Sequence, residues 1–203
     1  MLLQALAIVF IGSANKIVMR LLFIIFISLL SFTLSAQSFG LKTGAAMTNF
    51  SGDDAEGVDF RTGFYFGSFM KLGEANIRYS PEVIFHQKGG LVDQTIDTIT
   101  VSNEIKTNYV DIAFNGNFHI NDELALVLGP YFAYAFSGST GDESMDWDIY
   151  NKTEFGANIG ATYEVNDLFH VDLRYGLAFT DIMEAKTIKN RSIQIGIGYI
   201  FSY

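Results

Sequence analysis

The sequence contains no cysteine among its 203 residues. This absence excludes disulfide bonds, thiolate metal sites, a cysteine nucleophile and the lipidated cysteine of a bacterial lipoprotein. Only two prolines are present, and after residue 36 no apolar run approaches the ~20 residues that a membrane-spanning helix needs. The mean hydropathy is nevertheless positive, +0.24, so hydrophobic residues are distributed along the chain. Any anchoring in a membrane is therefore expected to come from the fold itself.

Positive charge is also scarce. The sequence has 13 lysine and arginine residues against 22 aspartate and glutamate residues. Lys16 and Arg20 lie in the expected leader, which leaves 11 basic against 22 acidic residues and a net charge of −11 for the rest. This balance predicts no nucleic-acid partner. No phosphate loop, nucleotide fingerprint or histidine-rich metal motif is present, and nothing predicts a cofactor.

Residues 21–34 form a short apolar segment after the basic Arg20 and are followed by Ser35 and Ala36. This arrangement is typical of a secretory signal peptide, which we expect to be cleaved after Ala36. The alternative is that residues 1–34 form one or two transmembrane helices of an inner-membrane protein. It is less favoured because the apolar segment is shorter than a span.

A second apolar stretch precedes Met19. Because a leader that begins at Met19 would be complete by itself, residues 1–18 are expected to be a mis-assigned upstream start or an extension of the leader. The expected organisation is then a signal peptide at 19–36 and one domain at 37–203.

From Phe39 the sequence divides into eight segments in which apolar and polar residues alternate. In the last segment, Ile193, Ile195 and Ile197 alternate with small or polar residues, and the aromatic residues that follow continue the same face. A period of two predicts β-strands, and each segment has about the ~9–11 residues of a tilted transmembrane strand. The segments are 39–47, 60–70, 76–88, 109–119, 124–136, 155–165, 169–180 and 192–203.

The connections between these segments alternate in length. Brief ones near Gly73, Asn121 and Asn166 alternate with longer polar ones at 49–59, 89–104, 138–152 and 180–190. Short periplasmic turns and long external loops are typical of outer-membrane barrels, and an even strand number places both termini in the periplasm. The predicted fold is therefore all-β: an eight-stranded antiparallel up-and-down transmembrane β-barrel, preceded by a cleaved signal peptide, in the outer membrane of a Gram-negative bacterium.

The alternate face of the segments is charged. A soluble β-sandwich or lipocalin-like barrel would also alternate, but burying unpaired charges in its dry core would cost several kcal/mol each. An eight-stranded barrel has an interior about large enough for its own side chains. We therefore expect a paired polar network that fills the lumen, and a gated conduit or proton path is the alternative. The predicted network consists of Lys42, Arg78, Glu82, Asp111, Glu164, Asp172 and Arg174.

Two further features concern individual strands. Pro81 and Pro130 fall inside predicted strands, where each removes a ladder hydrogen bond, and we expect β-bulges there. Tyr199, Phe201 and Tyr203 form an aromatic C-terminus, which we interpret as the insertion signal that barrel-insertion machinery reads.

Several segments in this order resemble the PorT-like outer-membrane β-barrel family of Bacteroidetes-type bacteria. The likeness covers nearly all of residues 37–203, and it implies location and fold more strongly than activity. Some members of that family are linked to type IX secretion and gliding, and the family has no catalytic motif to match here. The segments are FGLKTGAAMTNFSG at 39, SPEVIFHQKGG at 80, YVDIAFNGNFHI at 109, GPYFAYAFSG at 129, LRYGLAFTDI at 173 and KNRSIQIGIGYIF at 189.

Three histidines, His86, His119 and His170, fall on inward positions. A hydrolase would need a nucleophile within hydrogen-bond reach of one of them, and Ser80 lies too far along the strand from His86. Only a dyad assembled across strands would make the protein a lipid hydrolase, which is the third hypothesis for its function.

The predicted first and third external loops are acidic. Such clusters are usually solvated, although oxygen-rich loops can also hold calcium or bridge lipopolysaccharide. Trp147 within the second cluster is an alternative contact residue for a ligand or partner. The acidic residues are Asp53, Asp54, Glu56 and Asp59 in the first loop and Asp142, Glu143, Asp146 and Asp148 in the third.

The first hypothesis is therefore a non-enzymatic, monomeric outer-membrane barrel with a structural, envelope-assembly or secretion-accessory role. The runner-up is a small ligand-binding or transport barrel that acts through its external loops. The expected partners are outer-membrane lipid, the barrel-insertion machinery, and secretion-system or envelope proteins.

Overall fold

The computed structural model describes residues 37–55, 57–73, 76–96, 99–183 and 186–202. The predicted signal peptide at 19–36, the upstream residues 1–18 and Tyr203 lie outside these residues. No helix in the described part of the chain is long and apolar enough to cross a membrane. The strands are β1 (Gln37–Ser51), β2 (Val58–Asp59), β3 (Arg61–Leu72), β4 (Ile77–Ile96), β5 (Ile99–His119), β6 (Leu124–Thr140), β7 (Glu143–Ser144), β8 (Thr153–Glu164), β9 (Phe169–Ala178) and β10 (Lys189–Ser202).

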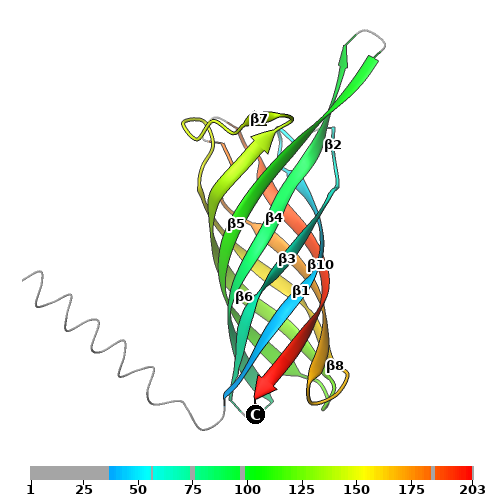
Figure 1. The fold of residues 1–203 in the computed structure, drawn as a ribbon, viewed down its shortest axis with the longest axis vertical. Helices are drawn as coiled ribbons and strands as arrows, with labels where there is room; N and C mark the ends of the chain where they lie inside the picture. The colour runs from blue at the N-terminus through cyan, green and yellow to red at the C-terminus, as the bar shows by residue number, and fades with distance from the viewer. Residues whose placement is uncertain (1–36, 56, 74–75, 97–98, 184–185, 203) are drawn as a thin grey trace, which may run out of the picture. The chain divides into compact units, whose positions relative to one another are not determined.

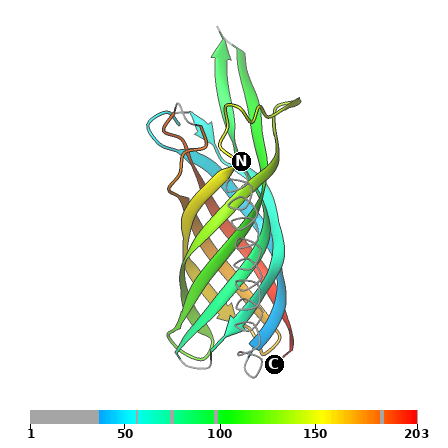
Figure 2. The same ribbon diagram turned by 90° about the vertical axis from the view of Figure 1, so that its left-hand side faces the viewer.

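Eight long strands form a closed antiparallel barrel (Figures 1 and 2). Each pairs with its neighbour in the order β1, β3, β4, β5, β6, β8, β9, β10, and β10 pairs back with β1, where Leu41 lies opposite Tyr199 and Ala45 opposite Ile195. Closure leaves no long strand with a free edge, which a membrane requires because lipid cannot hydrogen-bond to the backbone. The prediction of an eight-stranded antiparallel barrel is confirmed.

The two faces of the wall differ as the alternation predicts. On β10, Ile195 is 57% exposed while the next residue inward, Gln194, is buried; on β9, Leu173 is 54% exposed while Asp172 is fully buried. A soluble barrel would bury its apolar face and expose its polar one. The soluble alternative is therefore wrong for this chain.

The barrel has two unlike ends. The connections β3–β4, β5–β6 and β8–β9 are short and lie at the end where β1 begins and β10 ends, which we call the turn end. Asn121 and Asn166 make these turns tight, because each side-chain oxygen accepts hydrogen bonds from backbone N–H groups two and three residues later. The longer connections lie at the opposite end, the loop end.

The predicted loop at 89–104 is wrong. β4 and β5 continue through it and stay paired out to Ile96 and Ile99, so that a two-stranded ribbon projects beyond the barrel wall (Figure 1). Residues of high β-propensity, among them Val92 and Val101, favour this extended pairing despite the polar composition. Short strands also occupy two other predicted loops: β2 pairs with β4, and β7 pairs with β6.

The expected bulges at the two prolines are also wrong. The register is continuous on both sides of each proline, and the described register shifts lie instead at Phe39/Gly40 and Asn108/Tyr109. Pro81 keeps its pairing with β5 and Pro130 keeps its pairing with β8, while the ladder on the other side of each proline skips two residue pairs. A gap in the ladder therefore accommodates the missing N–H group without an extra residue.

A glycine pair at the closing seam makes room for the largest fully buried side chain. Gly44 of β1 lies opposite Gly196 of β10, and Tyr65 of β3 is 1% exposed beside them. A Cβ atom on Gly196 would overlap the Tyr65 hydroxyl and lie 2.9 Å from the Cα of Gly44. The seam therefore depends on the absence of a side chain at this point.

We predict that Gly196→Ala lowers the free energy of unfolding by roughly 3 kcal/mol, because one added methyl group overpacks the seam. Urea-dependent unfolding in detergent, followed by circular dichroism and by heat-modifiable migration on gels, measures this. Ile195→Val, on the exposed outer face next to it, is the control and should change little. Equal stability of the alanine variant and the native protein would contradict the packing argument.

Candidate functional site

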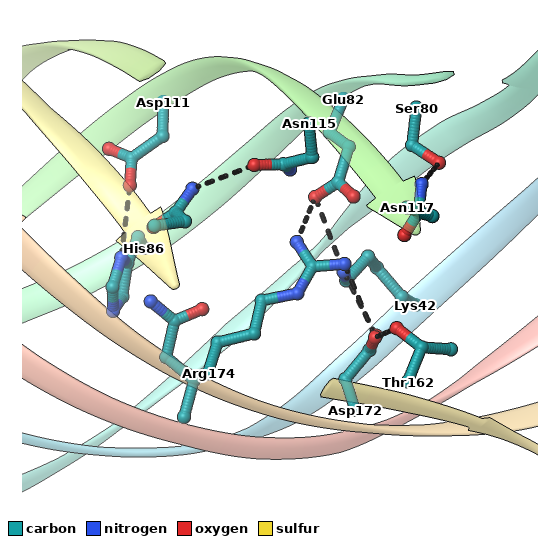
Figure 3. A network of polar contacts seen from close by, with 12 residues as sticks. Lys42, Ser80, Glu82, His86, Asp111, Asn115, Asn117, Thr162, Asp172 and Arg174 are labelled. Atoms are coloured by element: carbon teal, nitrogen blue, oxygen red, sulfur yellow. Dashed lines mark hydrogen bonds and ion pairs between the residues drawn. The ribbon is translucent and has the colours of Figure 1, made fainter. Parts of the chain in front are cut away.

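The centre of the lumen holds a layer of four ion-paired side chains, which we call the central layer: Lys42, Glu82, Asp172 and Arg174 (Figure 3). The Lys42 Nζ atom lies 3.2 Å from Glu82 Oε2 and 3.0 Å from Asp172 Oδ2. The Arg174 guanidinium lies 2.8 Å from Glu82 Oε2 and 3.2 Å from Asp172 Oδ1. None of the four side chains is more than 5% exposed.

These four residues come from distant parts of the wall. Lys42 lies on β1, Glu82 on β4, and both Asp172 and Arg174 on β9, so that the ion pairs cross the lumen. Two cations and two carboxylates balance each other, and Thr162 donates a further hydrogen bond of 2.6 Å to Asp172. Balance and hydrogen bonding offset the cost of removing these charges from water.

A second charged cluster, the upper layer, lies toward the loop end. Lys88 Nζ lies 2.7 Å from Glu154 Oε1 and 3.1 Å from Asp111 Oδ2, and it stacks over the rings of Tyr109 and Tyr131 at 4.8 and 4.6 Å. Tyr131 also donates a hydrogen bond of 2.8 Å to Glu154. This layer therefore packs aromatic rings around one buried ammonium group.

Neutral polar side chains lie near the central layer (Figure 3). Asn117 donates a 2.7 Å hydrogen bond to the Ser80 hydroxyl, and Asn158 donates one of 3.4 Å to Asn115. All four are buried. Amide and hydroxyl groups thus add to the polar filling around the ion pairs.

The turn end carries a third, more open cluster. Lys71 Nζ lies 2.6 Å from Glu164 Oε1, and Arg78 Nη1 lies 3.5 Å from the same oxygen. The side chains of Glu164 and Arg78 are 21% and 33% exposed. The structure therefore brings four of the seven predicted lumen residues together in the central layer, places Asp111 in the upper layer, and places Arg78 and Glu164 at the rim.

Sequence reasoning did not assign Lys88, Glu154 or Lys71 to the network. A signal for the first two exists in the sequence: Lys88 continues the inward face of its segment, and Glu154 precedes the inward Gly156 by two residues. Glu154 falls before the predicted start of its strand, which in the structure begins at Thr153. Lys71 directly follows the predicted segment 60–70, in which the alternation is irregular and gives no clear inward face.

Two loops pack against each other and against the upper layer at the loop end. Met145 is buried and its sulfur accepts a hydrogen bond from Thr107, while Trp147 packs against the cluster that contains Tyr109 and Tyr131. The next loop joins this cover, because the N–H of Asn151 donates to the carbonyl of Ile182 at 2.9 Å. These contacts place Met145 and Trp147 directly beside the aromatic residues of the upper layer.

Within the described residues, His86 is not hydrogen-bonded to a hydroxyl nucleophile. His86 Nδ1 lies 3.0 Å from Asp111 Oδ2, but its other ring nitrogen is buried and has no hydrogen-bond partner. Ser80, the nearest hydroxyl on the same face of the strand, is bonded to Asn117 instead. Among the described residues, no group of three histidine or acidic side chains is placed to hold a metal ion.

The profile of the outer membrane protein beta-barrel domain family matches residues 35–184. The chain belongs to this family. No curated protein matches the chain by sequence.

Solved structures show the same fold as this outer-membrane barrel. Neisserial surface protein A, NspA, superposes with a TM-score of 0.57 at 13% identity, covering 82% of this chain and 100% of its own. Ail, the attachment invasion locus protein of Yersinia pestis, superposes with a TM-score of 0.50 at 18% identity, covering 81% of this chain and 98% of its own. At these identities the likeness concerns the fold alone.

Aromatic side chains gather on the outer face of the barrel near the turn end. Tyr199 and Phe201 of the predicted insertion signal point outward, and Phe201 stacks on Phe39 with ring centroids 5.8 Å apart. Tyr163 directs its hydroxyl to Glu123 at 2.9 Å. Rings with polar tips at this level are typical of the interfacial girdle of outer-membrane barrels. Tyr203 lies outside the described residues.

We predict that Arg174→Met lowers the free energy of unfolding of this barrel by about 3–5 kcal/mol, because it leaves Glu82 and Asp172 with one cation between them. Urea titration in lipid vesicles measures the loss. The double variant Asp172→Asn, Arg174→Met restores charge balance and should recover part of it. A double variant less stable than Arg174→Met alone would show that charge balance does not control the central layer.

Proposed function

We propose that the protein is a non-enzymatic barrel of a Gram-negative outer membrane whose lumen is closed by its own side chains. In this proposal it has a structural, envelope-assembly or secretion-accessory role and acts through the surfaces at its two ends. The observation that carries the proposal is the central layer, in which buried ion pairs join three strands across the lumen.

The orientation follows from the two unlike ends. A signal peptide delivers the chain to the periplasm, and the turn end, which holds the start of β1 and the end of β10, stays there. The loop end, with the β4–β5 ribbon, then faces the cell exterior. The resemblance of the ordered segments supports, as part of this proposal, membership of the PorT-like branch found in Bacteroidetes-type bacteria.

One observation favours the runner-up, a ligand-binding barrel that acts through its loops. The ribbon extends β4 and β5 well beyond the wall and gives an external partner a large surface (Figure 1). Trp147 is a weaker candidate for such contact, since it packs inward and Lys152 lies over its ring at 5.3 Å. A barrel-borne hydrolase has no such support, because His86 has no hydroxyl bonded to its free ring nitrogen.

We predict that the purified barrel shows no steady ion conductance in planar bilayers, because the central and upper layers occupy the lumen. A variant in which residues 145–149 are replaced by a short glycine–serine linker should also be silent, since the layers beneath remain. A porin measured under the same conditions provides the positive control.

Steady conductance steps from the native protein would contradict the proposal of a closed lumen. Steps from the loop variant alone would show that Met145 and Trp147 form the barrier and that the ion-paired layers do not. Heat-modifiable migration of both samples confirms that folded barrels were added to the bilayer.

We predict that deletion of residues 201–203 leaves export intact but impairs insertion, because it removes the end of the proposed signal formed by Tyr199, Phe201 and Tyr203. The level of heat-modifiable protein in the outer-membrane fraction should fall several-fold while the periplasmic level rises. Phe118→Leu, which alters an exposed aromatic residue near the turn end of β5 and not on the strands that pair with β10, is the matched control. Unchanged insertion after the deletion would make the terminal aromatics part of the girdle only.

A further inference from the structure

Cations and carboxylates are matched almost completely inside and at the rim of the barrel. In the described part of the chain, six basic side chains have an acidic partner: Lys42, Arg61, Lys71, Arg78, Lys88 and Arg174. Five others form no ion pair within the same residues: Lys106, Lys152, Lys186, Lys189 and Arg191. Two of these five, Lys189 and Arg191, lie on one strand, and we call them the basic pair.

The basic pair faces outward at the loop end of β10. Arg191 is exposed and Lys189 is half-buried, whereas Asn190 between them is buried in the lumen. Beyond Arg191, the same face continues with Ile193 and Ile195, which are exposed to lipid. Alternate residues of a strand stand about 7 Å apart on one face. The two cations therefore continue the lipid-facing stripe past its apolar end.

The paired neighbours of these cations are neutral. Arg191 lies opposite Asn49 of β1 and Leu177 of β9, and Lys189 lies opposite Ser51. Among the described residues, Asp54 brings a carboxylate near this strand end; it accepts a 2.8 Å hydrogen bond from the N–H of Thr187 and forms no ion pair with either cation. Within the described residues, the protein thus places apolar side chains below the basic pair and forms no ion pair with either cation.

We propose that the basic pair binds the phosphate-bearing headgroup of a lipid in the leaflet at the loop end, with its acyl chains along Leu177 and Ile193. Arginine presents paired donors that match phosphate oxygens, and lysine adds a second positive charge at the same level. The inference rests on the proposed orientation, in which this leaflet is the outer one. The ligand class is then a phosphorylated glycolipid such as lipid A.

The charge of the loops favours a lipid over a soluble anion. The loops above the basic pair carry exposed carboxylates, and residues 37–203 have a net charge of −11, so an anion approaching from solution is repelled. A lipid reaches Arg191 from the side, within the membrane plane. Lys106, the other outward cation on a long strand, stands alone on β5, four strands away around the barrel in either direction.

The test is lipid binding to the detergent-purified barrel, measured by native mass spectrometry. Native protein should retain bisphosphorylated lipid A and release its dephosphorylated form. The variant Lys189→Gln, Arg191→Gln should bind bisphosphorylated lipid A about tenfold more weakly, roughly the loss of one strong charge-assisted contact. Lys152→Gln removes a positive charge at the same end and should bind as the native protein does.

Equal retention of the dephosphorylated lipid, or undiminished binding by the double variant, would overturn the proposal. Inorganic tripolyphosphate provides the other arm: if it binds the basic pair as tightly as lipid A does, the site takes soluble anions and the lipid assignment fails. Protease cleavage of residues 142–149 in intact cells tests the orientation separately. If the barrel binds lipid but residues 142–149 are not cleaved in intact cells, the proposed orientation is wrong. The headgroup site at the basic pair would still be supported.

Discussion

A charged side chain buried inside this barrel needs an oppositely charged partner there. The rest of the structure depends on how the central layer provides these ion pairs. Lys42, Glu82 and Arg174 reach one another only if their strands hold a single register around the whole wall. A slip of β1 by one residue would turn Lys42 toward lipid and leave two carboxylates short of a cation. The register that closes the seam between β1 and β10 is therefore the same register that keeps the charges of the lumen balanced.

The same register divides the chain between two solvents. Each inward step that places a polar side chain in the lumen places an apolar one against lipid, as Asp172 and Leu173 show on β9. The inside is crowded enough that Tyr65 fits only beside glycines, so the wall has little freedom to widen. If the lumen is closed as proposed, the outer face and the two ends are the surfaces left for other molecules to contact.

The alternation of apolar and polar residues predicts the strands where one face contacts lipid, because lipid requires apolar side chains on that face. Beyond the membrane it no longer predicts them. On β9 and on β10 after Arg191 the outward residues form an apolar stripe, so the period of two predicts these strand segments directly. Above the membrane, Thr95 and Thr100 are free to be polar although their strands remain paired. The polar sequence of the β4–β5 ribbon therefore predicts a loop. Backbone pairing stabilises the ribbon instead, and this pairing needs no apolar face.

The sequence predicts which charged side chains point into the lumen. It does not predict which of them lie in the same layer. Period two shows that Glu82, Asp111 and Glu164 share the lumen, but their heights depend on strand tilt and stagger, which a single sequence does not fix. Glu82 consequently meets Arg174 at the centre, Asp111 meets Lys88 in the upper layer, and Glu164 meets Lys71 at the rim. Pairing across the lumen joins residues tens of positions apart, beyond the reach of local pattern.

Buried charges in the lumen need an opposite charge from the protein, whereas charges on the outer face do not. The two faces of the wall therefore differ in how their cations are neutralised. Inside the barrel, the chain supplies the partner of each buried cation in the central and upper layers, because no other counter-charge is available there. On the outer face, Arg191 lies at the border of the apolar stripe, where its strand neighbours are neutral and the environment contains anions of its own. A cation at that border needs no carboxylate from the protein if a lipid phosphate takes the place. Lys189 and Arg191 form no ion pair within the described residues, which would destabilise a lumen; in the proposed arrangement this leaves both cations available to a lipid phosphate.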